Sequence, residues 1–321
     1  MAHLIAVVER SCALLAAVLL VGCGSSQPTS TACNGRDALC ARAYDQVAFP
    51  GTHNAYSNVD ESFGAPDQTY TMTRQLEDGV RVLHLEIYAF DDDAYLCHAV
   101  CPIGKKLLVD GFTEIRKFVD DHPRDVVTLL MESSNVTTDA IASALDASHL
   151  GRRLHVQRAG APWPTLGELL SNGDRVVAFL ADQTSTGGGT YPALLGRWDW
   201  TWETPWNNQT PADFTRCGAD RGVMGNDLYV VDTYLEDQII PTPDHAALVN
   251  DNPFLIERLL HCQAARGRPP NFVMVNYYEI GDLFADVDAL NGFSDLPDGD
   301  ADAFAPTWDD AGTDLGTAPS D

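Results

Sequence analysis

Two segments of this chain alternate between apolar and polar residues, and each has a glutamate at or near the end of its polar face. In residues 81–88 the two-residue period of a β-strand places His84 and Glu86 on one face, opposite three aliphatic side chains. In residues 126–132 the same period places Glu132 at the end of the polar face. In a closed parallel barrel the carboxyl ends of the strands form one rim, so these acids should meet there.

Further strand-like segments alternate with helix-like segments along the chain. The other strand-like segments are residues 47–49, 175–181, 228–233 and 272–278, and the helix-like segments are residues 111–121, 138–148 and 253–263. This alternation is typical of βα repetition. After an export segment about 300 residues remain, enough for one (β/α)8 barrel or two smaller domains. Because no linker interrupts the middle, we expect one α/β domain over residues 33–293.

The N-terminus has the features of an export signal. Residues 11–22 form an apolar stretch that is too short to span a bilayer comfortably, and Leu20-Val-Gly-Cys23 follows the bacterial lipobox pattern. We expect a lipoprotein signal peptide over residues 1–22, lipidation of Cys23 and an anchor linker over residues 23–32. The protein would then be exported and held at a membrane, in the periplasm or on the cell surface. A soluble secretory signal is the alternative.

The cysteine content supports export. Of eight cysteines, one lies in the signal and one is the lipidation site, which leaves an even number. We expect three disulfides in an oxidising compartment, which join Cys33 to Cys40, Cys97 to Cys101, and Cys217 to Cys262. A metal site built from these thiols is the alternative, but they lack a compact Cys-x-x-Cys spacing.

The charge of the chain limits its partners. The formal net charge is −26 and the pI is near 4.4, so nucleic acid would be repelled, and so would an anionic lipid surface. Part of this charge lies in residues 294–321, which are rich in Asp, Ala, Pro and Gly and are predicted to be a disordered acidic tail. We expect a monomer.

Four stretches of the chain resemble the phosphatidylinositol-specific phospholipase C X-domain family, the PLC-like phosphodiesterases. They are Phe49-Pro-Gly-Thr-His-Asn-Ala55, residues 75–86, Leu96-Cys-His98 and residues 111–132. Two later segments, residues 202–205 and 271–278, resemble the secreted bacterial branch of that family. The resemblance runs from about Cys33 to Asn291. It implies a TIM-barrel-like fold that is distorted or incomplete.

The resemblance also implies a reaction and two catalytic residues. The family cleaves a phosphodiester by attack of a neighbouring hydroxyl, which gives a cyclic phosphate, and His53 and His98 match its two histidines. A neutral imidazole can accept the proton of the hydroxyl, while a protonated one donates to the leaving alkoxide. For either histidine alone, the alternative is a structural role in the core or on the surface.

The residue at position 86 points to a metal. The metal-free bacterial members carry an arginine there, and the calcium-dependent members carry an acid, as here. Asn54, Glu86 and Glu132 together offer the hard oxygen ligands that Ca²⁺ or another divalent cation prefers. The alternative is that these acids make hydrogen bonds or salt bridges across the barrel mouth.

Two further positions depart from the family pattern. His84 stands where the calcium-dependent members usually have an acid, and an imidazole is a poor calcium ligand. Asn276 stands on the last strand, where related chains often carry an acid that orients a catalytic histidine. We expect His84 and Asn276 to be accessory residues, His84 in proton transfer.

Three functions compete. The first is a phospholipase C-type phosphodiesterase acting on phosphatidylinositol or a glycosylated form, because no basic cluster suits a polyphosphorylated inositol. The second is a glycerophosphodiester phosphodiesterase, which should carry His-Arg-Gly near the first strand, where this chain has His53-Asn-Ala55. The third is a non-catalytic surface lipoprotein that binds lipid head groups. The tryptophans of residues 198–206 are candidates for an interfacial lip, or for packing against the barrel.

Overall fold

The computed structural model describes residues 31–98, 100–181, 191–236 and 240–295. The chain divides into a unit over Met1–Ser30 and a unit over Thr31–Asp321, and all described residues belong to the second. The expected signal peptide, the lipidation site Cys23 and most of the acidic tail lie outside the described residues. In the part of the chain that is described, no helix is long and apolar enough to cross a membrane.

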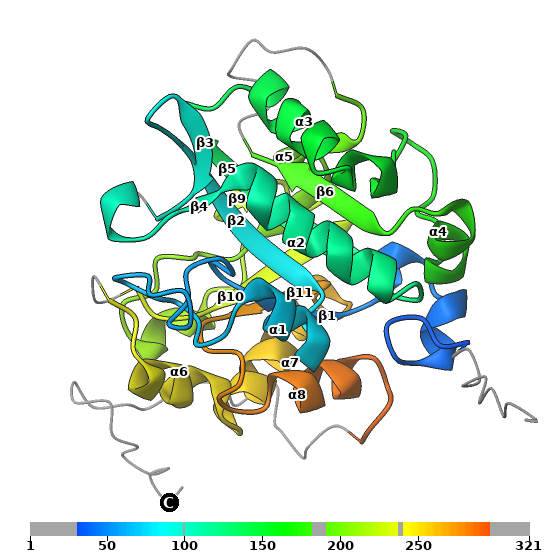
Figure 1. Cartoon of the computed structure of the whole chain (residues 1–321). Helices are drawn as coiled ribbons and strands as arrows, with labels where there is room; N and C mark the ends of the chain where they lie inside the picture. Colours follow the sequence, from blue (N-terminus) through cyan, green and yellow to red (C-terminus); the bar gives the residue numbers. More distant parts are fainter. Residues whose placement is uncertain (1–30, 99, 182–190, 237–239, 296–321) are drawn as a thin grey trace, which may run out of the picture. The chain divides into compact units, whose positions relative to one another are not determined.

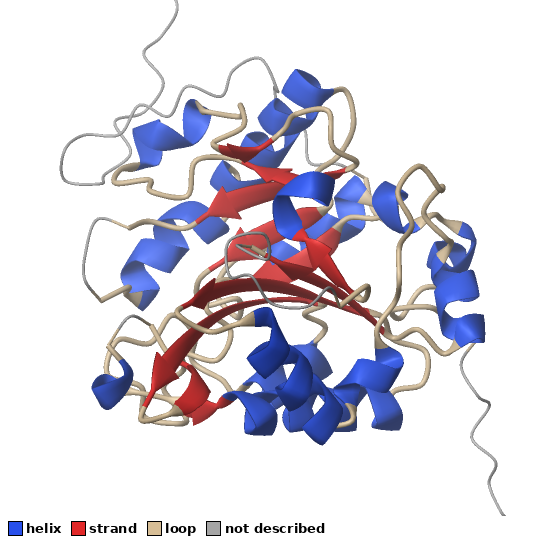
Figure 2. Ribbon diagram, turned by 90° about the horizontal axis from the view of Figure 1, so that it is seen from above, coloured by secondary structure: helices blue, strands red, loops and turns tan. Residues whose placement is uncertain are grey.

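The centre of the fold is a curled sheet (Figures 1 and 2). Its strands are β1 (Phe49–Thr52), β2 (Val82–Phe90), β3 (Asp93–Leu96), β4 (Lys106–Leu107), β5 (Val127–Ser134), β6 (Val176–Leu180), β7 (Leu194–Gly196), β8 (Thr201–Glu203), β9 (Arg221–Gly222), β10 (Leu228–Thr233) and β11 (Phe272–Val275). The order is β7-β6-β5-β2-β1-β11-β10-β8-β9. All neighbours from β7 to β8 pair in parallel, and β9 pairs with β8 antiparallel.

The barrel is open. The path ends at β7 and at β9, and within the described ranges no pairing joins these two strands. This confirms the expectation of a TIM-barrel-like α/β fold that is incomplete.

Helices surround the sheet (Figure 2). The α-helices are α1 (Met72–Asp78), α2 (Leu108–Asp121), α3 (Thr138–Ala147), α4 (Leu166–Asn172), α5 (Arg197–Trp200), α6 (Pro243–Asn250), α7 (Phe254–Arg266) and α8 (Leu283–Leu290). Short 3-10 helices are η1 (Asp37–Ala41), η2 (Tyr44–Gln46), η3 (Cys101–Ile103), η4 (Leu150–Arg153) and η5 (Pro211–Thr215). The three predicted helices correspond to α2, α3 and α7.

Threonine side chains fix where four of these helices begin. The hydroxyls of Thr71, Thr137, Thr165 and Thr242 each accept a hydrogen bond from the backbone N–H three residues on. Such a cap satisfies a donor that the first helical turn leaves unpaired, and contributes about 1 kcal/mol.

The two faces of the sheet carry two apolar clusters. Leu83, Leu85 and Ile87 belong to the cluster that includes helix residues such as Phe112, so this face of β2 packs against the helices. Val82 belongs to the second cluster, whose strand residues lie on the inner face of the curled sheet. The predicted alternation of β2 is therefore confirmed, and it places His84 and Glu86 on the inner face.

Two strands begin or end at other residues than the sequence predicted. The strand expected over residues 47–49 is found at Phe49–Thr52, because η2 precedes it and the register with β11 begins at Phe49. The strand expected over residues 272–278 ends at Val275. Beyond it Tyr277 has a φ of 47°, a left-handed conformation that leaves the extended path, and its N–H bonds to the carbonyl of Asp67.

All three expected disulfides are present, between Cys33 and Cys40, Cys97 and Cys101, and Cys217 and Cys262. The antiparallel hairpin of β2 and β3, which the sequence did not predict, carries the chain to Cys97 and His98. The second disulfide closes the loop that contains His98.

Candidate active site

A pocket lies at the carboxyl ends of the strands. It is lined by His53, His84, Glu86, His98, Glu132, Arg197, Trp206, Arg221, Asp232, Tyr234, Glu236 and Met274. His53 follows β1 directly, and Glu86 and Glu132 are paired neighbours on the parallel strands β2 and β5. The structure therefore brings together both expected catalytic histidines and both expected acidic ligands.

Contacts with four residues fix the position of His53. Its backbone N–H donates to the carbonyl of Val275 (3.0 Å), and its ring stacks on Tyr234 with centroids 3.9 Å apart. Its Nδ1 lies 3.0 Å from Oδ1 of Asn276 and 3.5 Å from Oδ1 of Asp67. Burial by itself lowers the pKa of His53, but the facing carboxylates, Asp67 foremost, raise it to about 9.

His98 lies at the mouth of the pocket, just beyond β3. Its side chain is 35% exposed, and its Nδ1 is 4.0 Å from Oδ2 of Asp67. Asp67 is fully buried in the loop between β1 and α1. One carboxylate thus lies between the two histidines.

His84 connects Asn54 to Glu132. Its Nδ1 is 3.2 Å from Oδ1 of Asn54, and its Nε2 is 3.4 Å from Oε1 of Glu132. Burial lowers the pKa of His84 to about 4 in spite of Glu132, so the ring is neutral near pH 7. Asn54 has a φ of 43°, a left-handed conformation that asparagine tolerates better than most residues.

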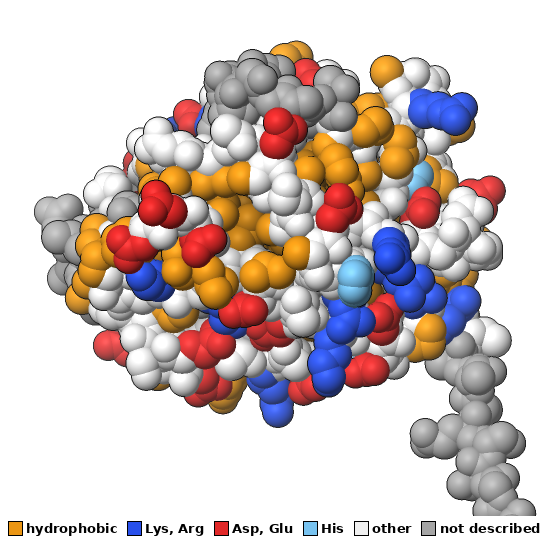
Figure 3. Space-filling model, turned by 45° about the horizontal axis from the view of Figure 1, so that its top comes forward, with side chains coloured by type: hydrophobic (Ala, Val, Ile, Leu, Met, Phe, Trp, Pro, Cys, Tyr) orange, Lys and Arg blue, Asp and Glu red, His pale blue; other side chains and the backbone are white. Residues whose placement is uncertain are grey.

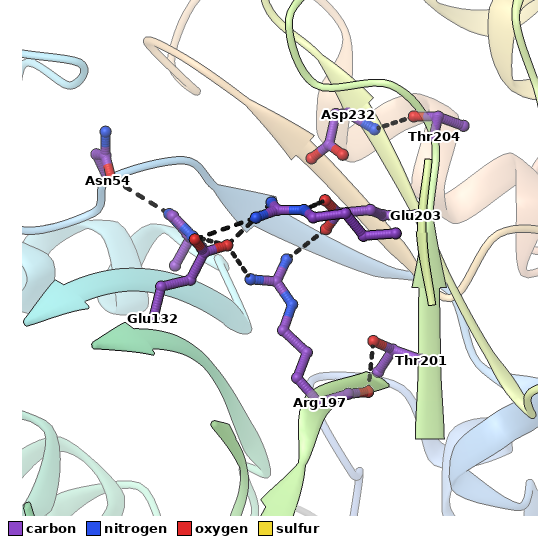
Figure 4. A network of polar contacts seen from close by, with 9 residues as sticks. Asn54, Glu132, Arg197, Thr201, Glu203, Thr204 and Asp232 are labelled. Atoms are coloured by element: carbon purple, nitrogen blue, oxygen red, sulfur yellow. Dashed lines mark hydrogen bonds and ion pairs between the residues drawn. The ribbon is translucent and has the colours of Figure 1, made fainter. Parts of the chain in front are cut away.

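Glu132 is the centre of an ion-pair network with two arginines. Arg197 donates from Nη1 to Glu132 (2.6 Å) and from Nη2 to Glu203 (2.6 Å). Arg221 lies 2.9 Å from Glu132 and also pairs with Glu203. Figure 4 shows Arg197 pointing between the two glutamates, with Asp232 beside them. Burial opposes the charge of Glu132, but His84 and the two guanidinium groups hold its pKa well below the usual range.

Two other acids of the pocket have raised pKa values, because burial outweighs the cationic groups near them. Burial raises the pKa of Glu86 to about 7, and its Oε2 is buried without a hydrogen-bond partner in the described residues. Burial, together with the charge of Glu203, raises the pKa of Asp232 to about 8. The pocket therefore holds more carboxyl groups than cationic side chains.

Comparisons with known proteins identify the family. The family model described as PI-PLC X 1 matches residues 39–291. This chain belongs to the PI-PLC X domain family. A PI-PLC X domain-containing protein 1 of the fungus Arthroderma benhamiae is 27% identical over 303 residues, which cover 87% of this chain and 95% of the relative.

A second protein of the same fungus, described as an uncharacterized secreted protein, is 27% identical over 279 residues. The match covers 80% of this chain but spans 62% of the length of that relative. The curated relatives come from a fungus and a plant, so the expected assignment to the secreted bacterial branch is not confirmed.

Solved structures support the fold. The phosphatidylinositol-specific phospholipase C from Listeria monocytogenes superposes with a TM-score of 0.53 and 12% identity. The superposition covers 78% of this chain and 95% of that one. Because only 12% of the residues are identical, this superposition supports the fold and nothing more specific.

Several residues of this PI-PLC X domain site were missed from the sequence, among them two arginines and the buried Asp67. Arg197 begins the short helix α5, Arg221 lies in the two-residue strand β9, and Asp67 lies in a loop. No periodic pattern surrounds any of them. The nearest signal was the tryptophan-rich stretch that both arginines contact, since their guanidinium groups lie 4.6 and 4.8 Å from the ring centroid of Trp198.

Of the four tryptophans expected as a lip, Trp198 and Trp200 are half-buried, and the other two differ clearly from each other. Trp202 is fully buried and stacks on Tyr229 with centroids 3.9 Å apart, so it packs against the barrel. Trp206 is 39% exposed and lines the pocket. Of these two, only Trp206 has the position expected of a lip.

Proposed function

We propose that this protein is a phosphodiesterase of the phospholipase C type, with His53 and His98 as its acid–base pair. The observation that carries the proposal is that both histidines line one pocket at the strand ends of a PI-PLC X domain, on either side of a buried carboxylate. Phosphatidylinositol or a glycosylated form is the proposed substrate.

The proposed step uses both imidazoles. One accepts the proton of the substrate hydroxyl next to the phosphate, and that oxygen forms a new bond to phosphorus. The other donates a proton to the alkoxide that leaves as the bond from phosphorus to the glycerol oxygen breaks. The products are a cyclic phosphate and a neutral diacylglycerol. Such transfers contribute about 10²–10⁴-fold per group.

The charge of the pocket supports the proposed substrate class. Both arginines that line it are engaged by Glu132 and Glu203. A head group with several additional phosphates would need cationic side chains that are not already neutralised. A diester with a single negative charge therefore suits this pocket better than a polyphosphorylated head group does.

A divalent cation, Ca²⁺ by preference, is part of the proposal. Glu86 fits it, because a cation would satisfy the buried Oε2 and favour the charged carboxylate. Asn54, the second expected ligand, would share its Oδ1 with the ring of His84, which lies 3.2 Å away. Glu132, the third expected ligand, would share its oxygens with Arg197 and Arg221. When bound, the ion would supply positive charge to the phosphate in a pocket rich in acids.

Chelation should therefore remove activity. We expect excess chelator to stop the release of water-soluble inositol phosphate from phosphatidylinositol vesicles, and added Ca²⁺ to restore it. Glu86→Gln should raise the Ca²⁺ concentration needed for half-maximal rate, because the amide keeps the shape and removes the charge. Glu77→Gln, an exposed change on α1, is the matched control. Full wild-type activity in excess chelator would contradict the metal proposal.

The lipid anchor is also a proposal. With a formal net charge of −26, the chain should be repelled by anionic lipid, so a covalent anchor would keep it near its substrate. On the face drawn in Figure 3, apolar side chains gather in patches, with acidic and basic side chains interspersed around them.

Cys23→Ser should move the protein from the membrane fraction to a soluble or unprocessed form, and should remove the mass of the acyl groups. Cys12→Ser, within the same expected signal, should change neither property. If Cys23→Ser leaves membrane partitioning and mass unchanged, the protein is not a lipoprotein anchored at Cys23.

A further inference from the structure

We infer that Asp67 is a positioning residue shared by both histidines, so that a single buried carboxylate orients the acid and the base together. This inference rests on the proposed function. Related chains often carry an orienting acid at position 276, and this chain has an amide there. The structure supplies the carboxylate from the opposite end of the chain, in the loop between β1 and α1.

The carboxylate faces the same ring atom of each histidine. Oδ1 of Asp67 lies 3.5 Å from Nδ1 of His53, and Oδ2 lies 4.0 Å from Nδ1 of His98. Both distances exceed that of a tight hydrogen bond, as is common in sites without substrate. The ring of His98 is one-third exposed, so a small rotation can shorten its contact.

The loop that carries Asp67 is fixed in place. The backbone N–H of Asp67 donates to the carbonyl of Ser57 (3.0 Å), and its carbonyl accepts from the N–H of Tyr277 (2.9 Å). The next residue, Gln68, donates from Nε2 to the carbonyls of His53 (2.8 Å) and Val275 (3.1 Å). Asp67 is therefore tied to the ends of β1 and β11, the strands that present His53 and Asn276.

A structural role does not explain this carboxylate. Asp67 is fully buried, and in the ranges that the structure describes neither oxygen has another hydrogen-bond donor. An unpaired buried carboxylate is costly, so it persists where nearby N–H groups or positive charges compensate it. The two imidazole rings are the groups placed to do so.

The shared contact has a chemical consequence. A carboxylate at Nδ1 favours the proton on that nitrogen, which leaves Nε2 of each ring directed at the substrate. The ring of His53 has a second acceptor in Asn276, and its other neighbours are Tyr234, His84 and the charges of Glu86, Glu236 and Asp232. In the described part of the chain, the ionic partner of His98 is Asp67. His98 should therefore depend on Asp67 more than His53 does.

The test is Asp67→Asn, an isosteric change that removes the charge and offers an amide to one ring. We expect kcat for inositol phosphate release to fall about 10²-fold or more, with KM changed far less. We also expect the ring ¹⁵N chemical shifts of His98, measured without substrate at a fixed pH, to show loss of the Nδ1–H tautomer. Asp286→Asn, a buried aspartate of α8, is the matched control and should change neither readout.

The double variant Asp67→Asn/Asn276→Asp separates the two histidines. A carboxylate at position 276 is placed to serve His53 alone, so the tautomer of His98 should stay altered and turnover should stay low. Turnover restored to the wild-type level would show that the contact with His98 is unnecessary, and would overturn the shared role.

The ¹⁵N measurement needs no substrate, so it distinguishes the two proposals. If the wild type does not cleave phosphatidylinositol but Asp67→Asn still changes the tautomer of His98, the proposed function fails and the shared contact stands. If the wild type is active, and Asp67→Asn keeps both full kcat and an unchanged His98 tautomer, the inference is wrong.

Discussion

His53→Ala and His98→Ala should each lower turnover of phosphatidylinositol by about 10²–10⁴-fold or more while the fold remains intact. Each change removes one of the two proposed proton-transfer groups, and the remaining histidine cannot serve as acid and base in the same step. The measurement is kcat for release of water-soluble inositol phosphate, with circular dichroism to confirm folding. His122→Ala, an exposed histidine at the end of α2, is the control and should keep wild-type turnover.

The two variants also differ in what they disturb. His53 is buried and stacked on Tyr234, so its removal should lower stability in addition to turnover. His98 is partly exposed, and its removal should affect turnover alone. If either variant keeps near-native kcat on phosphatidylinositol, that histidine is not catalytic.

Arg197→Ala should lower the free energy of unfolding by about 3–5 kcal/mol, because it removes one partner of a buried ion-pair network. The guanidinium of Arg197 lies between Glu132 and the fully buried Glu203, 2.6 Å from an oxygen of each. Without it, Arg221 faces both carboxylates alone. The measurement is the urea unfolding midpoint at neutral pH, with the slope checked for two-state behaviour.

Two further variants test whether the loss of stability in Arg197→Ala comes from the ion-pair network. Arg197→Lys keeps the charge, but a single ammonium does not reproduce the fork that reaches two glutamates, so it should recover part of the loss. Arg74→Ala removes an exposed arginine that pairs with Asp78 on α1, and should leave unfolding almost unchanged. An Arg197→Ala protein as stable as the wild type would show that the network contributes little to folding.

The sequence determined the central strands β1, β2, β5, β6, β10 and β11 and the faces of β2 and β5, but not the ends of β1 and β11 or the short strands β3, β4, β7, β8 and β9. Side-chain direction in a strand alternates with position, so the alternation in residues 81–88 assigned Leu83 to the helix-covered face and Glu86 to the inner face without knowledge of any partner strand. Parallel strands end at a common edge, which is why Glu86 and Glu132 lie side by side. Short separations also made two of the three disulfides predictable.

Only the tertiary structure decided how the charges of the pocket are neutralised. Arg197 and Arg221 meet Glu132 across 65 and 89 residues of sequence, from a four-residue helix and a two-residue strand that carry no periodic pattern. Asp67 reaches the two histidines from a loop whose path is set by its bonds to the ends of β1 and β11. Local patterns fix which way a side chain points from its own element, whereas ion pairs depend on where the curling of the sheet brings distant elements together.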